Sequence, residues 1–403
     1  MNHPIPPNTR LLSRGMVAVL VAQFLSALAD NALLFAAIAL LKSQHAPDWQ
    51  TPLLQEAFVL AFIVLAPFVG PFADAIPKGR AMLLANAMKL TGAAVMLSGA
   101  HPLLAYSLVG IGAAAYSPAK YGILGQLVSA DKLVKANSLI EGSTIVAILL
   151  GAVLGGLLAD WSVQGALTAV VGCYLLAALS NLLIPRLPAE HPLPHFSPLV
   201  LVRDFAVALR TLLRNRDARF SLFGTSIFWG AGSTLRFLLV AWVPVALLIT
   251  DNTVPATLSG VVAIGIAFGA AAAAKFVSLK TINRALPAGI VIGALIIVFA
   301  HVTTLPGAIV VLVLIGACGG FYVVPLNALL QERGHETVGA GHAIAVQNFF
   351  ENLTMLLLIG VYVLMTKADM PIVSAATWFG ALVLMGIGLL AWWRLASREA
   401  AGR

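Results

Sequence analysis

The sequence has few charged residues for its length. Only 10% of its 403 residues are Asp, Glu, Lys or Arg, whereas 60% are hydrophobic and the mean hydropathy is +0.96. Soluble globular proteins carry about 25% charged residues, and surface area does not shrink fast enough with size to hide so much apolar material. The composition excludes a soluble protein and indicates a chain that crosses a membrane many times.

Cysteine and histidine are also scarce. Cys173 and Cys318 lie far apart within apolar runs, so we expect two core residues rather than a disulfide or metal pair. None of the eight histidines has an Asp five positions further on, the spacing typical of a membrane acyltransferase, and no Ser–His–Asp or Cys/His metal pattern is present. We therefore expect that the protein is not an enzyme and that it binds no metal and no cofactor.

Long apolar runs are abundant. About twelve of them reach roughly 20 residues, the length that an α-helix needs to cross about 30 Å of hydrocarbon. They must be helices, because an open sheet would leave backbone groups unpaired in lipid. The predicted fold is all-α with twelve transmembrane helices, at approximately residues 15–41, 53–73, 81–100, 103–127, 134–160, 163–185, 220–249, 256–275, 285–302, 306–330, 338–366 and 371–393.

The positions of the basic residues predict the orientation. The net charge is +8, and with the N-terminus inside most of the 24 Lys and Arg fall in cytoplasmic segments. Only Lys42 and Lys367 fall in outer loops, while Lys89, Lys120 and Arg236 fall inside spans. This bias predicts that both termini are cytoplasmic. It also explains the basic composition as membrane topology, so nucleic acid is not expected as a partner.

The segment between spans six and seven divides the chain into two parts. Its first section is rich in proline and should be extended. From Leu199 to Arg214 apolar residues recur at helical spacing among arginines, which predicts an amphipathic helix on the anionic inner leaflet. The predicted parts are a six-helix bundle, a cytoplasmic linker with this helix, and a second six-helix bundle, at residues 1–185, 186–216 and 217–403.

A weak internal repeat relates the two halves. Pro118 and Pro325 differ by 207 positions, and nearly the same offset of 206 relates Asp30 to Arg236. The stretch Ala27-Leu28-Ala29 resembles a signal-peptidase site, but cleavage there would leave half a span. We therefore place Asp30 near the membrane midplane, where it and Arg236 would be pseudo-symmetric residues of opposite charge. A pair between them would join the two halves and could gate a central cavity.

The loop between spans two and three contains a recognisable motif, "GPFADAIPKGR". Its order of Gly70, Asp74, Gly79 and Arg80 looks like the loop signature of the major facilitator superfamily with one extra residue, and the 6+6 layout also resembles that superfamily. Asp74 is placed to face the positive N-terminal end of a neighbouring helix, and the resemblance implies that this helix is the eleventh span. We interpret these four residues as a gating latch; the alternative is a solvated turn.

Several polar residues lie inside the spans. Charges at the bilayer centre cost from about 3 to over 10 kcal/mol unless they are paired or hydrated. This set is either a structural ion-pair network or a site that contacts cargo, and Glu141 belongs to it in both cases. Lys89 is expected to reach the inner surface in a structural role. The candidate binding residues are Asp30, Asn31, Lys120, Tyr121, Arg236, Gln347, Asn348 and Glu351.

The charges of this set suggest the chemistry of a cargo. A guanidinium suits a phosphate or a carboxylate, and a nearby carboxylate suits an ammonium group. Phosphate and ammonium together form the head of a phosphatidylethanolamine-type lipid, and apolar helix walls would tolerate its acyl chain. The alternative is a proton-coupled drug or amphiphile exporter, in which buried acids carry protons. Two buried bases favour the phosphate-bearing cargo.

Several longer stretches resemble one family, the lysophospholipid transporters of bacterial inner membranes. They include "VAQFLSALADNALLFA", "GAAAYSPAKYGILGQL", "GTSIFWGAGSTLRFLLVAWVPVALLITDN" and "VGAGHAIAVQNFFEN". The resemblance implies a flippase that moves lysophosphatidylethanolamine, and lysophosphatidylglycerol, from the outer to the inner leaflet for reacylation. It also implies coupling to an acyl-acyl carrier protein synthetase that acts as acyltransferase, and we expect a monomer. Polar positions of the family correspond to Asp30, Lys120, Arg236 and Glu351.

Overall fold

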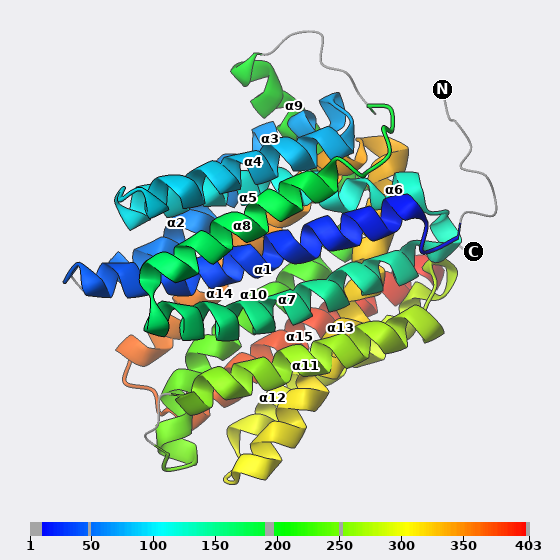
Figure 1. Cartoon of the computed structure of the whole chain (residues 1–403). Helices are drawn as coiled ribbons and strands as arrows, with labels where there is room; N and C mark the ends of the chain where they lie inside the picture. The colour runs from blue at the N-terminus through cyan, green and yellow to red at the C-terminus, as the bar shows by residue number, and fades with distance from the viewer. Residues whose placement is uncertain (1–9, 47–49, 190–196, 250–252, 400–403) are drawn as a thin grey trace. The chain divides into compact units, whose positions relative to one another are not determined.

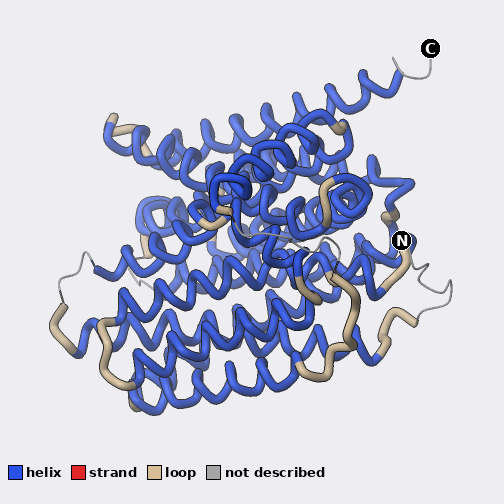
Figure 2. Tube along the Cα trace, turned by 90° about the horizontal axis from the view of Figure 1, so that it is seen from above, coloured by secondary structure: helices blue, strands red, loops and turns tan. Residues whose placement is uncertain are grey.

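The computed structural model describes residues 10–46, 50–189, 197–249 and 253–399. In this part of the chain every regular element is a helix, and strands are absent (Figure 2). Helices satisfy their backbone hydrogen bonds internally, as a chain in lipid requires. The predicted all-α class is confirmed for the described residues. Cys173 and Cys318 are free cysteines, and both are partly buried.

The first six predicted spans correspond to the helices before the linker (Figure 1). A short 3₁₀ turn, η1 (Ala130–Lys132), precedes the fifth of them. The helices are α1 (Arg14–Ser43), α2 (Gln50–Val64), α3 (Ala66–Ala75), α4 (Lys78–Leu97), α5 (Pro102–Gly122), α6 (Leu124–Leu127), α7 (Leu133–Trp161) and α8 (Val163–Asn181).

The described parts of the linker and of the second half are also helical. One helix, α9 (Pro198–Arg214), lies in the predicted linker. After it come α10 (Arg216–Ala246), α11 (Thr253–Phe276), the 3₁₀ segment η2 (Leu279–Ala285), α12 (Leu286–Ala300), α13 (Leu305–Thr337), α14 (Ala340–Lys367) and α15 (Ile372–Glu399).

The described helices are consistent with twelve spans. Nine are long and apolar enough to cross a membrane, or ten when α2 and α3, which are bent by 66°, count as one broken span. The bend falls next to Pro67 in the first turn of α3, and the residue before a proline disfavours helical geometry. The two further candidates are α4 and α5, of 20 and 21 residues, whose polar side chains lower their hydropathy.

The chain packs as two compact units. Two short segments pack with the unit formed mainly by the opposite half of the sequence, namely 137–142 in α7 and 331–349 at the junction of α13 and α14. The predicted division into two six-helix bundles therefore stays a prediction. The first unit contains Met1–Ala136, Ser143–Leu212 and Gln331–Phe349, and the second contains Asn137–Gly142, Leu213–Leu330 and Phe350–Arg403.

Within each unit, glycines allow helix backbones to touch. A Cβ on Gly112 of α5 would lie 2.8 Å from the carbonyl oxygen of Ala85 in α4. In the second unit, a Cβ on Gly269 of α11 would overlap the carbonyl oxygen of Ala317 in α13. Small residues that permit such close approach are typical of helix packing in membranes.

Helix α9 confirms the predicted amphipathic helix. Its buried side is formed by Leu201, Phe205, Ala208 and Leu212. The ring of Phe205 meets Phe349 of α14 edge-on, with ring centroids 5.7 Å apart. The apolar side of α9 therefore packs against protein in the first unit, and its contact with the inner leaflet stays a prediction.

Candidate functional site

Asp30 lies at the centre of a buried polar cluster in the first unit. The Lys89 ammonium of α4 forms an ion pair with Asp30 Oδ2 at 2.7 Å. The Tyr174 hydroxyl of α8 donates a hydrogen bond to Asp30 Oδ1, also at 2.7 Å. Both carboxylate oxygens of the predicted midplane acid are thus bonded by side chains of the same unit.

A second layer of polar groups holds Lys89 in place. Its ammonium donates to Ser26 Oγ at 3.0 Å, and Ser26 in turn donates to Asn86 Oδ1 at 2.7 Å. The ammonium also lies 4.9 Å from the centre of the Tyr116 ring, which adds a cation–π contact. Ser26 precedes Asp30 by one turn of α1, and Asn86 precedes Lys89 by about one turn of α4, so each helix presents its two polar residues on one face.

The prediction that Lys89 reaches the inner surface is wrong. Its side chain is 2% exposed and pairs with Asp30 inside the unit. Helical spacing carries the signal that would have found this cluster, because Ser26 with Asp30 and Asn86 with Lys89 each form a polar face in an otherwise apolar helix. A buried ammonium requires a counterion, and Asp30 supplies it.

The predicted pair of Asp30 with Arg236 would join the two units and stays a prediction; within its own unit, Asp30 is bonded to Lys89 and Tyr174. Arg236 lies on α10 in the second unit, and its side chain is exposed. A constant offset between the halves predicts equivalent depth along a span, but it does not determine which way each side chain points.

The binding candidates on α5 and α14 are brought together in the first unit. The Asn348 side-chain amide donates to Ser117 Oγ at 2.9 Å. Ser117 precedes Lys120 and Tyr121 by one turn of α5, and the Lys120 ammonium lies 4.2 Å from the centre of the Tyr121 ring. Gln347, next to Asn348, is buried. The Asn348–Ser117 bond therefore joins α14 to α5 one turn before Lys120 and Tyr121.

The remaining candidates have separate surroundings. Asn31 donates its side-chain amide to the carbonyl oxygen of Ala27 on its own helix, at 2.8 Å. Glu351 is buried in the second unit. Glu141 accepts a hydrogen bond from Asn327 of α13 at 3.3 Å, with both side chains buried. The hydrogen bond between Asn327 and Glu141 thus helps to join the 137–142 segment to the rest of the second unit.

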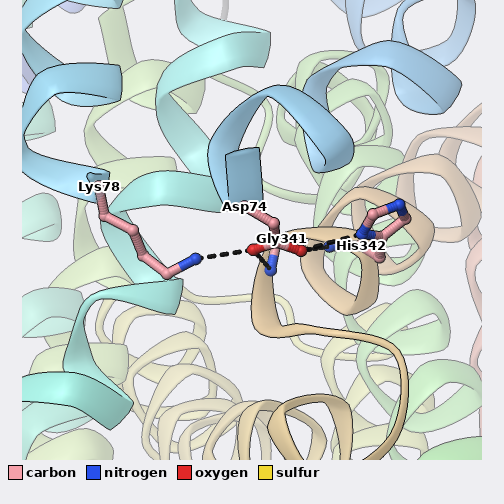
Figure 3. Close-up of polar contacts among 4 residues, drawn as sticks. All are labelled: Asp74, Lys78, Gly341 and His342. Atoms are coloured by element: carbon pink, nitrogen blue, oxygen red, sulfur yellow. Dashed lines mark hydrogen bonds and ion pairs between the residues drawn. The ribbon is translucent and has the colours of Figure 1, made fainter. Parts of the chain in front are cut away.

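Asp74, at the end of α3, binds the start of α14 (Figure 3). Its Oδ1 accepts the backbone N–H of Gly341 at 2.8 Å, and its Oδ2 accepts that of His342 at 3.1 Å. The His342 ring nitrogen Nδ1 lies 2.9 Å from the same Oδ2. The first backbone N–H groups of a helix have no partner within it and carry partial positive charge, so a carboxylate suits them.

Two glycines make this contact possible. A Cβ on Gly70 would lie 2.9 Å from the His342 Cα, and a Cβ on Gly341 would lie 2.7 Å from the Gly70 carbonyl oxygen. The predicted packing of Asp74 against the end of this helix is confirmed. A gating role for Gly70, Asp74, Gly79 and Arg80 is not tested by the geometry and stays a proposal.

The cation beside Asp74 is Lys78 rather than Arg80. The Lys78 ammonium lies 2.7 Å from Asp74 Oδ1, and both side chains are fully buried (Figure 3). Arg80 is exposed, and Gly79 packs near Ile184. Sequence reasoning missed Lys78 and His342. The signal for Lys78 was its position four residues after the acid, whereas nothing in the sequence singled out His342.

Comparison with known proteins identifies the family. Residues 19–359 match the model of the Major Facilitator Superfamily. The chain is 58% identical over 367 residues to the Lysophospholipid transporter LplT of Serratia proteamaculans, covering 91% of this chain and 92% of that protein. It is 56% identical over 394 residues to the Lysophospholipid transporter LplT of Escherichia coli O7:K1, covering 98% and 99%. The chain belongs to the lysophospholipid transporter family of the Major Facilitator Superfamily.

Solved structures agree with the major facilitator fold. The human organic anion transporter MFSD10 superposes with a TM-score of 0.77 at 17% identity, covering 94% of this chain and 99% of that one. The E. coli fucose:proton symporter FucP superposes with a TM-score of 0.73 at 15% identity, covering 94% and 98%. At these identities the likeness shows the fold alone, and it confirms the predicted major facilitator class.

Proposed function

We propose that this protein is a lysophospholipid transporter of the bacterial inner membrane. It moves lysophosphatidylethanolamine and related lysolipids from the outer to the inner leaflet by alternating access. The identity to lysophospholipid transporters over nearly the whole chain carries this proposal. The major facilitator fold supports it, because transport is what the solved proteins of this fold in the comparison perform.

The headgroup binds to charged side chains inside the membrane. Lys120 and Arg236 bind the phosphate, because cations inside a membrane require anionic partners. The exposure of Arg236 and the cluster around Lys120 support these roles. Asp30 or Glu351 meets the ammonium or glycerol group, and the acyl chain stays among apolar helix walls. Asn31, Tyr121, Gln347 and Asn348 complete the polar lining.

The Asp74 contact acts as a cytoplasmic latch. It joins the end of α3 in the N-terminal half of the sequence to the start of α14 in the C-terminal half. While this contact holds, those two helix ends cannot separate. The latch therefore stabilises the form that is closed toward the cytoplasm, and its release accompanies delivery of the lysolipid to the inner leaflet.

The membrane setting follows from the topology prediction. Both termini lie in the cytoplasm, and the protein works as a monomer. The lysolipid delivered to the inner leaflet is reacylated there by an acyl-acyl carrier protein synthetase that acts as acyltransferase. The positive-inside distribution of basic residues supports this orientation.

Uptake of labelled lysophosphatidylethanolamine into liposomes that contain the purified protein tests the proposal. Replacing Arg236 by Ala should lower uptake at least tenfold, because losing one charge-assisted bond to phosphate costs about 1.5–3 kcal/mol. The control is Lys367→Ala, which removes an exposed cation at the C-terminal end of α14. Uptake by this variant should stay unchanged. Normal uptake by the Arg236 variant would remove this residue from the mechanism.

The same liposomes separate the transporter from a proton-coupled exporter. Measuring uptake with and without a proton gradient shows whether protons drive the step. A wild-type protein that ignores lysolipids but expels a cationic amphiphile when a gradient is imposed would overturn the proposal.

A further inference from the structure

The pair of Asp30 and Lys89 is unequally exposed. The Asp30 side chain is 19% exposed, whereas the Lys89 side chain is only 2% exposed. The carboxylate thus lies at the accessible side of the pair, and the ammonium lies behind it. A ligand that approaches the cluster therefore contacts Asp30 first. The charge of Lys89 acts on this ligand from behind the carboxylate.

Lys89 is fixed in this position. Ser26 accepts one of its N–H groups and the Tyr116 ring covers it. Gly112 of α5 lies against its stem, because a Cβ there would come within 2.7 Å of Lys89 Cγ. The ammonium cannot turn toward another acid without breaking these contacts, so its charge stays paired with Asp30.

The Asp30 carboxylate keeps some capacity to accept hydrogen bonds. A carboxylate has about four lone-pair sites, and the structure uses one for Lys89 and one for Tyr174. The partial exposure of Asp30 leaves the others within reach of a further donor. An ammonium or a hydroxyl group of a headgroup is such a donor.

We propose that Lys89 is a positioning residue that sets which headgroup charge the transporter accepts. It cancels the charge of Asp30, so that the cluster presents an oriented acceptor without net charge. A neutral cluster admits both zwitterionic and anionic lysolipids. This inference rests on the proposed lysolipid transport. It adds a physical reason why one transporter accepts headgroups of different charge.

Single substitutions in the pair should shift headgroup preference in opposite directions. Lys89→Met leaves the negative charge of Asp30 uncompensated, which disfavours an anionic headgroup. Asp30→Asn leaves the positive charge of Lys89 uncompensated, which favours an anionic headgroup. The double variant is neutral again and should return the preference toward that of the wild type.

The experiment compares two probes in the same liposomes, zwitterionic lysophosphatidylethanolamine and anionic lysophosphatidylglycerol. The measured quantity is the ratio of their initial uptake rates. Lys89→Met should change this ratio about tenfold in favour of the zwitterion, and Asp30→Asn should change it by a similar factor in favour of the anion, given unit charges a few ångströms apart in a partly screened site. The double variant should lie within about threefold of the wild type.

Two controls separate this role from a structural one. Lys89→Arg keeps the charge and should keep the ratio, and Lys135→Met removes an exposed cytoplasmic cation and should also keep it. A merely structural role would lower both uptake rates by the same factor. If the Lys89→Met protein does not accumulate in the membrane, Asp30→Asn and the double variant test the same prediction.

The possible failures are distinguishable. An unchanged ratio in Lys89→Met and Asp30→Asn, with the wild type transporting both lysolipids, would overturn this inference and leave the proposed function standing. A wild-type protein that transports neither lysolipid would overturn the proposed function and this inference together.

Discussion

The connection between α3 and α4, here called loop 2–3 after the predicted spans, and the connection between α11 and α12 that contains η2, here called loop 8–9, are held in different ways. In loop 2–3, Asp74 binds the start of α14, so a contact of the N-terminal half reaches into the C-terminal half of the sequence. In loop 8–9, Asn283 of η2 accepts a hydrogen bond at 2.8 Å from Arg394 of α15, which belongs to the same half.

Arg394 connects three elements of the second unit. Besides Asn283, it pairs with Asp217 at the start of α10 at 3.1 Å and lies 4.1 Å from the centre of the Phe220 ring. Its side chain is 4% exposed. The two loops therefore make different contacts: one links the N-terminal half of the sequence to the C-terminal half, and the other links elements of the same half. Substitutions in the two loops should have different consequences.

The largest effect is expected for Arg394→Ala. Removing one partner of a buried pair typically costs 3–5 kcal/mol, and because Asp217 is 31% exposed we expect about 2–3 kcal/mol of lost stability. Thermal unfolding in detergent should show a lower Tm. Transport per folded molecule should be nearly normal. Unchanged stability would mean that loop 8–9 is held by something other than this arginine.

A smaller loss of stability and a larger loss of transport are expected for Asp74→Asn. The amide keeps the size of the side chain but removes the charge that Lys78 and the helix end require, at a cost of about 1–3 kcal/mol. In a background without Cys173 and Cys318, a cysteine at Ser117 should be labelled faster by a reagent added from the cytoplasmic side. If labelling and uptake stay as in the wild type, Asp74 is not a latch.

The smallest effect is expected for Arg80→Ala. Arg80 was predicted to belong to the latch, but its side chain is exposed and Lys78 occupies the position beside Asp74. Surface substitutions away from such contacts change stability by about 0.5 kcal/mol or less. Lysolipid uptake should stay within about twofold of the wild type. A loss comparable to that of Asp74→Asn would restore Arg80 to the gating mechanism.

The sequence predicts elements better than contacts. Hydropathy places the spans well, because burial in lipid requires long apolar helices whatever their neighbours are. The contact of Asp74 at the end of α3 was also predictable, because the order of Gly70, Asp74, Gly79 and Arg80 resembles the loop signature of the superfamily. Lys89 was misjudged, because a single basic residue in an apolar helix has the same pattern whether it reaches water or meets an acid on another helix.

Backbone contacts between helices restrict the motions that alternating access can use. Where Gly269 of α11 meets Ala317 of α13, and where Gly112 of α5 meets Ala85 of α4, no side chain separates the two main chains. Neither pair can slide or twist internally without steric overlap. Each pair therefore travels as one rigid body, and the hinges of the transport cycle must lie at other helix junctions.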